Sequence, residues 1–178
     1  MKTIRTPQIY AIIALVISIV YFIVAAHSSE LIIYDIKETV LVLFFLCILF
    51  VPDRLSKLWL IPFWAYPVLS IVEIVLESQN YNSYFSDYIV EYSLEFAMFV
   101  FAGIILLAIK GGQKSMRITL TVLLVIFGLT VVYKSLWYVV LGDNGYVATY
   151  LLFSLPEALS MICILSYDKM QNKTISPK

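Results

Sequence analysis

The stretch EIVLESQNYNSYFSDYIVEYSLE, residues 73–95, decides the fold. It contains the end of one apolar segment, a short polar loop and the start of the next apolar segment. Glu73 and Glu77 are four residues apart, as are Glu91 and Glu95, so each pair lies on one face of a helix. The stretch therefore predicts two helices joined by a short loop, with carboxylates close to the loop on both sides.

The composition around this stretch is that of a membrane protein. Of the 178 residues, 62% are hydrophobic and 13% are charged, whereas soluble domains have about 45–50% apolar and about 25% charged residues. Mean hydropathy is +0.93, and the zero net charge gives no indication of a nucleic-acid partner. Cys47 and Cys163 lie in apolar runs, where we expect buried free thiols and no metal pair. We therefore predict an all-α, polytopic helix bundle in the lipid bilayer, without a cofactor.

Six apolar segments follow one another, each about long enough to cross a bilayer. They cover residues 9–26, 31–51, 58–77, 88–109, 118–140 and 146–167. The chain, residues 1–178, is then one integral membrane domain of six transmembrane helices with a loose tail at 168–178. We expect Pro62 and Pro67 in the third segment, and Pro156 in the sixth, to kink or interrupt their helices. The first segment also has features of a signal peptide, but its apolar part is long for one, and we expect it to be retained.

The basic residues predict the orientation. With six spans and both termini in the cytoplasm, ten of the twelve Lys and Arg residues fall on the inner side, and the exceptions are Lys37 and Lys134. This distribution satisfies the positive-inside rule and indicates a protein of the inner, or plasma, membrane. Lys110, Lys114 and Arg117 form a basic inner surface and are the candidates for contact with a cytoplasmic partner.

Most acidic residues lie on the outer side or in the outer half of a span. From a rise of about 1.5 Å per helical residue, Glu73 and Lys134 lie roughly 6–9 Å deep, Glu95 about 10 Å deep, and Glu157 near the midplane. A charge near the centre costs at least about 2.5–3.5 kcal/mol if it faces lipid, so we expect the deep residues to face the bundle interior or a wet cavity, to be neutralised, or to be paired. Lys134 is the basic residue at comparable depth, and we expect it to pair with one or two of the acids.

Tyrosine and tryptophan residues occupy the same layer as these acids. Carboxylates among aromatic faces can hold an organic cation by charge and by cation–π attraction. The candidate ligand, ion or interface residues are Glu38, Glu73, Glu91, Glu95, Lys134, Glu157, Tyr92 and Trp137. Two interpretations remain open: an outward-facing, acidic and aromatic vestibule for a small cationic ligand, or solvated helix ends and structural helix–helix pairs.

Small residues recur in the first segment at Ala11 and in Ala14-Leu-Val-Ile-Ser18. With six spans, both ends inside and an outward site, this layout resembles the substrate-binding subunits of energy-coupling-factor vitamin transporters. The resemblance implies a subunit that binds a small molecule from outside and docks through the first segment. The chain departs from that family in having only six glycines and no clean AxxxA pair.

The sequence contains no catalytic pattern. HExxH, GxSxG, Walker and CxxC motifs do not occur, and there is a single histidine. We therefore expect a non-enzymatic subunit that acts as a sensor, anchor or assembly component of a membrane complex, for example in bacterial envelope stress or phage defence. It would work as a homo-oligomer or with a cytoplasmic protein partner. The alternatives are a binding or transport subunit for a small cationic ligand, and an oligomeric cation channel with a ring of Glu95 or Glu157.

Overall fold

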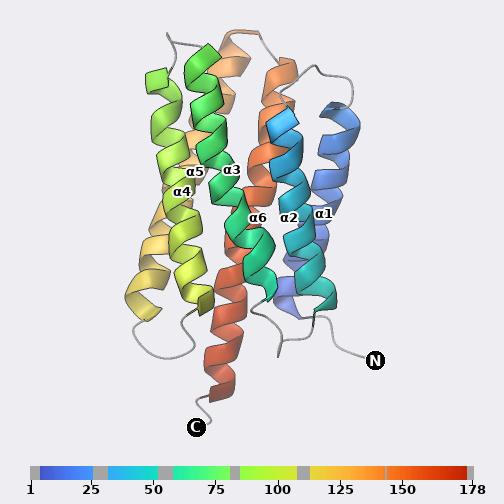
Figure 1. Ribbon diagram of the computed structural model, residues 1–178, viewed down its shortest axis with the longest axis vertical. Coiled ribbons are helices and arrows are strands. Elements are labelled where there is room, and N and C mark those ends of the chain that lie inside the picture. The colour runs from blue at the N-terminus through green and yellow to red at the C-terminus, as the bar shows by residue number, and fades with distance from the viewer. Residues whose placement is uncertain are drawn as a thin grey trace.

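The computed structural model describes residues 5–25, 32–51, 58–80, 85–107, 113–142 and 144–175. They form the helices α1 (Thr6–Ala25), α2 (Ile32–Phe50), α3 (Leu60–Asn80), α4 (Phe85–Leu107), α5 (Gln113–Val140) and α6 (Asn144–Ile175) (Figure 1). No strand occurs in the described ranges. The predicted all-α fold class is confirmed.

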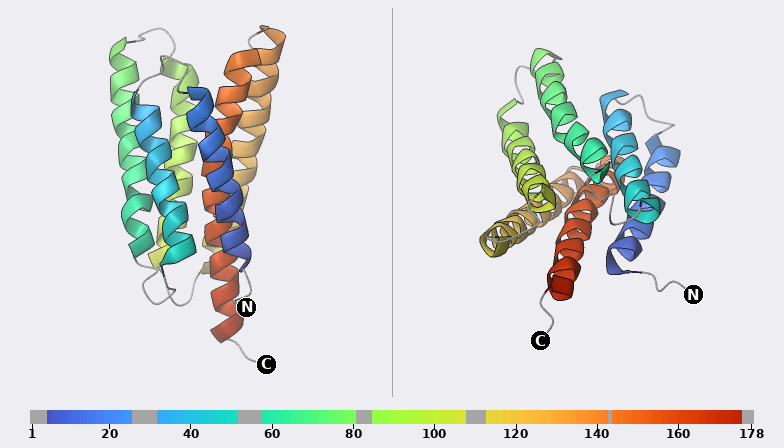
Figure 2. Two further views of the ribbon diagram at one scale, coloured as in Figure 1. Left: turned by 90° about the vertical axis from the view of Figure 1, so that its right-hand side faces the viewer. Right: turned by 60° about the horizontal axis from the view of Figure 1, so that its bottom comes forward.

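Consecutive helices run antiparallel along the long axis of the bundle, and both chain termini lie at the same end (Figure 1). Helix α6 occupies the central position, because it packs against α1, α2, α4 and α5. The right-hand view of Figure 2 shows α1 and α2 to one side of α6, and α4 and α5 to the other. Helix α3 packs between α2 and α4. Four helices, α2, α3, α4 and α6, therefore surround a shared interior.

Among the described residues, three helices are long and apolar enough to cross a membrane: Thr6–Val24, Lys114–Val140 and Val147–Lys169. Helices α3 and α4 contain shorter apolar stretches, Leu60–Leu76 and Tyr92–Leu107. Both of these helices and α2 carry charged residues that shorten their apolar runs. These three helices support the prediction of a membrane protein.

Four charged side chains of α2, α3 and α4 point into the bundle. Lys37 and Glu38 on α2, Glu73 on α3 and Glu95 on α4 are at most 3% exposed. The outer faces of the helices are apolar instead. On α5, for example, the fully apolar side chains of residues 129, 136 and 140 are all exposed. Soluble monomers rarely expose contiguous apolar surface on this scale, whereas lipid tails accept it.

Helix α1 packs through a stripe of small residues. Ala11, Ala14 and Ser18 are fully buried, and their spacing places them on one helix face. Small side chains let two helix backbones approach closely, and the Cys163 thiol of α6 lies 3.5 Å from the carbonyl oxygen of Pro7. The small residues that carry the resemblance to vitamin-transporter subunits therefore pack against other helices of the same chain.

The sequence predicted that the prolines would kink or interrupt their helices, but no proline interrupts a helix among the described residues. Helix α3 continues through Pro67 and α6 continues through Pro156. Pro62 lies in the first turn of α3, where the missing backbone N–H would have no partner within the helix.

Residues 168–175 of the tail that was expected to be loose are helical, and residues 176–178 lie outside the described residues. Helix α6 continues to Ile175 and extends past the ends of the other helices (Figure 1). Asp168 is buried, and its Oδ2 lies 2.9 Å from Nε of Arg117 near the start of α5. Trp59, just before α3, packs edge-on against Tyr167 with ring centroids 4.7 Å apart. These contacts hold α6 against the bundle where the sequence suggested only a polar end.

Candidate functional site

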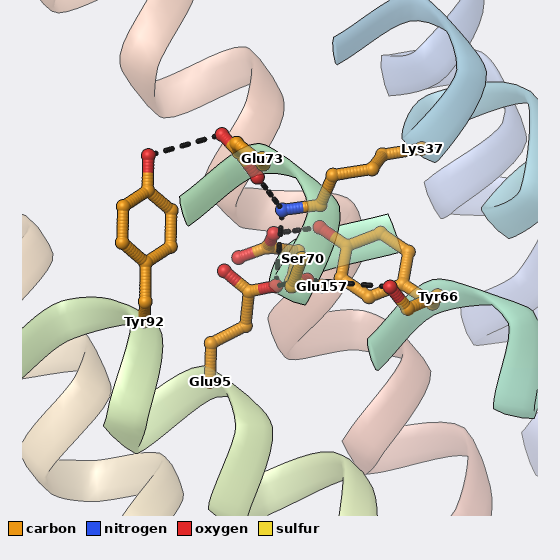
Figure 3. Close-up of polar contacts among 7 residues, drawn as sticks. All are labelled: Lys37, Tyr66, Ser70, Glu73, Tyr92, Glu95 and Glu157. Carbon is orange, nitrogen blue, oxygen red and sulfur yellow. Dashed lines mark hydrogen bonds and ion pairs between the residues drawn. The ribbon is translucent and has the colours of Figure 1, made fainter. Parts of the chain in front are cut away.

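Four buried charged side chains meet inside the bundle, each from a different helix (Figure 3). They are Lys37 of α2, Glu73 of α3, Glu95 of α4 and Glu157 of α6, and all are at most 3% exposed. We call these four residues the charged centre. They place one ammonium group and three carboxyl groups in the interior shared by these helices.

Lys37 holds two of the carboxylates directly. Its Nζ donates to Oε2 of Glu73 over 2.7 Å and to Oε1 of Glu95 over 3.0 Å. Charge-assisted hydrogen bonds of this kind are roughly twice as strong as neutral ones. A single ammonium group therefore connects α2 to both α3 and α4.

Each carboxyl group of the charged centre also accepts a hydrogen bond from a hydroxyl group (Figure 3). Glu73 accepts from Tyr92 over 3.0 Å, Glu95 accepts from Ser70, and Glu157 accepts from Tyr66. Tyr66, Ser70 and Glu73 are spaced by four and three residues, so one face of α3 supplies all three to the interior. Helix α3 is consequently the main supporting wall of the site.

Aromatic rings surround the ammonium group of Lys37. Its Nζ lies 4.7 Å from the ring centroid of Tyr66, 5.2 Å from that of Phe153 and 5.9 Å from that of Tyr92. The Tyr66 ring is itself stacked on Phe99, with centroids 4.3 Å apart. A desolvated cation–π contact is worth about 2 kcal/mol or more. The lysine occupies the kind of surroundings that an ammonium ligand would require.

The charged centre is not balanced in charge. One ammonium and three carboxylates give a formal charge of 1 − 3 = −2 when all are ionised. Glu157 interacts electrostatically with Lys37, but one positive charge offsets only one of the three negative charges. Uncompensated charge in a buried apolar interior is costly, so the remainder requires a proton or a further cation.

Glu38 is a fifth buried charged residue, next to Lys37 on α2. It is fully buried, and neither of its carboxyl oxygens has a hydrogen-bond partner among the described residues. The hydroxyl of Ser18 on α1 lies near it, but the two groups do not form a hydrogen bond of normal geometry. Glu38 therefore lies outside the hydrogen-bond network of the charged centre.

The structure brings together Glu73, Glu95, Glu157 and Tyr92 of the predicted site residues. Two others, Lys134 and Trp137, lie on α5. Trp137 is 55% exposed, and Nζ of Lys134 lies 5.9 Å from the ring centroid of Tyr150. Glu91 lies on α4, but its side chain is outside the described residues.

The lysine that pairs with Glu73 and Glu95 is Lys37, whereas the sequence analysis expected Lys134 in this role. Lys37 is near the start of its helix, and it was not among the residues to which the sequence assigned a depth. The sequence analysis also missed Tyr66, Ser70 and Phe153. The one available signal was the presence of Lys37 and Glu38 together inside a predicted span, because intramembrane ionisable residues usually mark a site.

The site is closed in this structure. The sequence analysis allowed for an outward-facing vestibule, but the four residues of the charged centre are buried. Within the described ranges, no group of three or more His, Cys, Asp or Glu residues is placed to hold a metal ion. The arrangement is suited to holding a proton or a small cation.

The predicted inner contact surface is divided in the structure. Lys114 is exposed at the start of α5, whereas Arg117 forms the ion pair with Asp168. Lys110 lies outside the described residues.

Comparison of the chain with protein family models, curated proteins and solved structures found no match.

Proposed function

We propose that the chain is an integral protein of the inner membrane with six membrane-spanning helices and cytoplasmic termini. The antiparallel order of the helices and their apolar outer faces support this placement (Figure 1). In the sequence, basic residues follow α2 and α4, and both helices end where α1 begins, at the same end of the bundle. By the positive-inside rule, that end faces the cytoplasm.

We propose that the protein is a non-enzymatic sensor subunit that responds to a proton or a small cation at the charged centre. The observation that carries this proposal is one buried ammonium group that pairs with two carboxyl groups and interacts electrostatically with a third. A proton or cation that joins the centre changes which carboxylates compete for Lys37. Because the centre connects α2, α3, α4 and α6, such a change alters how these helices pack.

A purely structural role explains the charged centre less well. Replacing a buried ion pair by well-packed apolar side chains is often neutral or stabilising by about 1–4 kcal/mol. A bundle that needed only stability would therefore gain little from three carboxyl groups around one lysine. A site that changes its charge by binding a proton or a cation requires carboxyl groups in excess of the lysine.

A second candidate function is a binding or transport subunit for a small organic cation. The aromatic faces of Tyr66, Tyr92 and Phe153 around Nζ of Lys37 favour it, because carboxylates and ring faces together recognise ammonium groups. The buried positions of Glu95 and Glu157 inside one chain give less support to a channel with a ring of either residue across subunits. A cytoplasmic partner, if the sensor has one, would meet Lys114 and the projecting end of α6.

Thermal unfolding of the full-length protein in lipid nanodiscs tests the sensor proposal. We expect the unfolding temperature of the wild type to depend on pH around neutrality and on added sodium or methylammonium. Glu157→Gln should remove at least half of that dependence, because it removes one of the three competing carboxylates. Asp35→Asn, which changes an exposed acid on α2, is the matched control and should keep it. A wild type insensitive to pH and to both cations would exclude the sensor proposal.

A further inference from the structure

Glu38 is a buried acidic residue that the charged centre does not use. Its side chain is fully buried, and both of its carboxyl oxygens lack hydrogen-bond partners among the described residues. The Ser18 hydroxyl is also fully buried and also lacks a hydrogen-bond partner among the described residues. Buried polar groups nearly always have a partner, so two adjacent ones without any require an explanation.

The charged and titratable groups around Glu38 give an ionised carboxylate no hydrogen bond of normal geometry. Helix α1 contributes the hydroxyl of Ser18, which lies near the carboxyl group without forming such a bond. On α2 itself, Lys37 attracts Glu38 electrostatically but donates its hydrogen bonds to the carboxylates of α3 and α4. The carboxyl groups that α3 and α6 bring to this region, Glu73 and Glu157, are further acids. An ionised Glu38 would therefore be a buried charge without hydrogen bonds, which is strongly unfavourable.

An exposed acid lies one helical turn from Glu38 on the same helix. Asp35 is three residues earlier on α2 and is exposed, and the rise along the helix is about 4.5 Å for three residues. Positions three apart share a helix face. Helix α2 thus carries one carboxyl group at the surface and a second one just inside, beside the lysine of the charged centre.

We propose that Glu38 is a proton-binding residue, which exchanges a proton with the surface near Asp35 and sets the charge beside Lys37. With its proton bound, Glu38 is neutral and leaves Lys37 to Glu73 and Glu95. When it loses the proton, its negative charge attracts Lys37 and competes with those two carboxylates. This inference relies on the proposed membrane placement, but it adds a site outside the charged centre.

Infrared spectroscopy of the full-length protein in liposomes tests this inference, because a protonated carboxyl group has a carbonyl band that a carboxylate lacks. At neutral pH we expect Glu38→Gln to lose the band intensity of one protonated carboxyl group per chain relative to wild type. Asp35→Asn is the matched control and should lose none. Equal band intensity in Glu38→Gln and wild type would overturn the inference.

Ser18→Ala keeps the inference testable if Glu38→Gln does not fold. This change removes one oxygen atom next to Glu38, so we expect the same band at a shifted frequency. A band that neither shifts nor weakens in Ser18→Ala would show that it arises elsewhere. If the Glu38 band is absent while the unfolding temperature still depends on cations through Glu157, the inference fails and the proposed sensor function stands.

Discussion

Replacing Lys37 by methionine should destabilise the protein more than any other conservative change in the bundle. Methionine keeps the unbranched length of the lysine side chain but removes the ammonium group, which leaves Glu73 and Glu95 buried without a counter-ion. Breaking a buried ion pair by removing one partner costs about 3–5 kcal/mol. Lys37 serves two carboxylates and three ring faces, so we expect the upper half of this range.

The origin of this cost can be isolated by restoring electrical neutrality. In the triple variant Lys37→Met, Glu73→Gln, Glu95→Gln, no unpaired carboxylate remains at these positions, and we expect most of the lost stability to return. Reversible unfolding in mixed detergent micelles, followed by tryptophan fluorescence, measures both free energies. Acidic pH should also lessen the cost of Lys37→Met, because protonated carboxyl groups need no counter-ion. A single variant as stable as wild type, or a triple variant no better than the single, would refute this reasoning.

Three further predictions concern packing and hydrogen bonds. Gly103→Ala should destabilise the protein by about 1–3 kcal/mol in thermal unfolding, because a Cβ there would lie 2.2 Å from the Trp64 ring. Gly128→Ala is the control: nothing lies within 4 Å of a Cβ at this position, so the change should be neutral or stabilising. Tyr92→Phe should cost about 0.5–1.5 kcal/mol in the same assay, because it removes one hydrogen bond to the charged centre. Asp168→Asn should speed hydrogen exchange at the end of α6 and leave α3 unchanged, because it weakens the ion pair to α5; equal exchange would argue against that role.

The acids of the charged centre could be predicted from sequence because their signal is local. Glu73 and Glu95 lie in apolar segments and flank one loop, and Glu157 lies deep in another span. Their lysine could not be assigned in the same way. Lys37 is 36 residues from Glu73 and 58 from Glu95 along the chain, so their pairing depends on how the helices pack.

Other features of the structure have no sequence signal of their own. A tyrosine or serine in an apolar span, such as Tyr66 or Ser70, is also compatible with ordinary packing. The helical end of α6 depends on Asp168 meeting Arg117 across two helices. The sequence predicted a span at residues 31–51, but α2 is not among the helices apolar enough to cross a membrane, because the buried Lys37 and Glu38 interrupt its apolar run.

Proton uptake by the full-length protein is the most direct test of the central claim that the charged centre binds a proton or a small cation. The measurement compares wild type with a variant whose charged centre is neutral: Lys37→Met, Glu73→Gln, Glu95→Gln and Glu157→Gln. The only added cation should be N-methylglucamine, which is too bulky for a closed site. Across neutral pH, where exposed carboxylates stay ionised and lysines stay protonated, we predict that the wild type takes up at least one more proton per chain than the variant. Equal uptake by the two proteins would contradict the account.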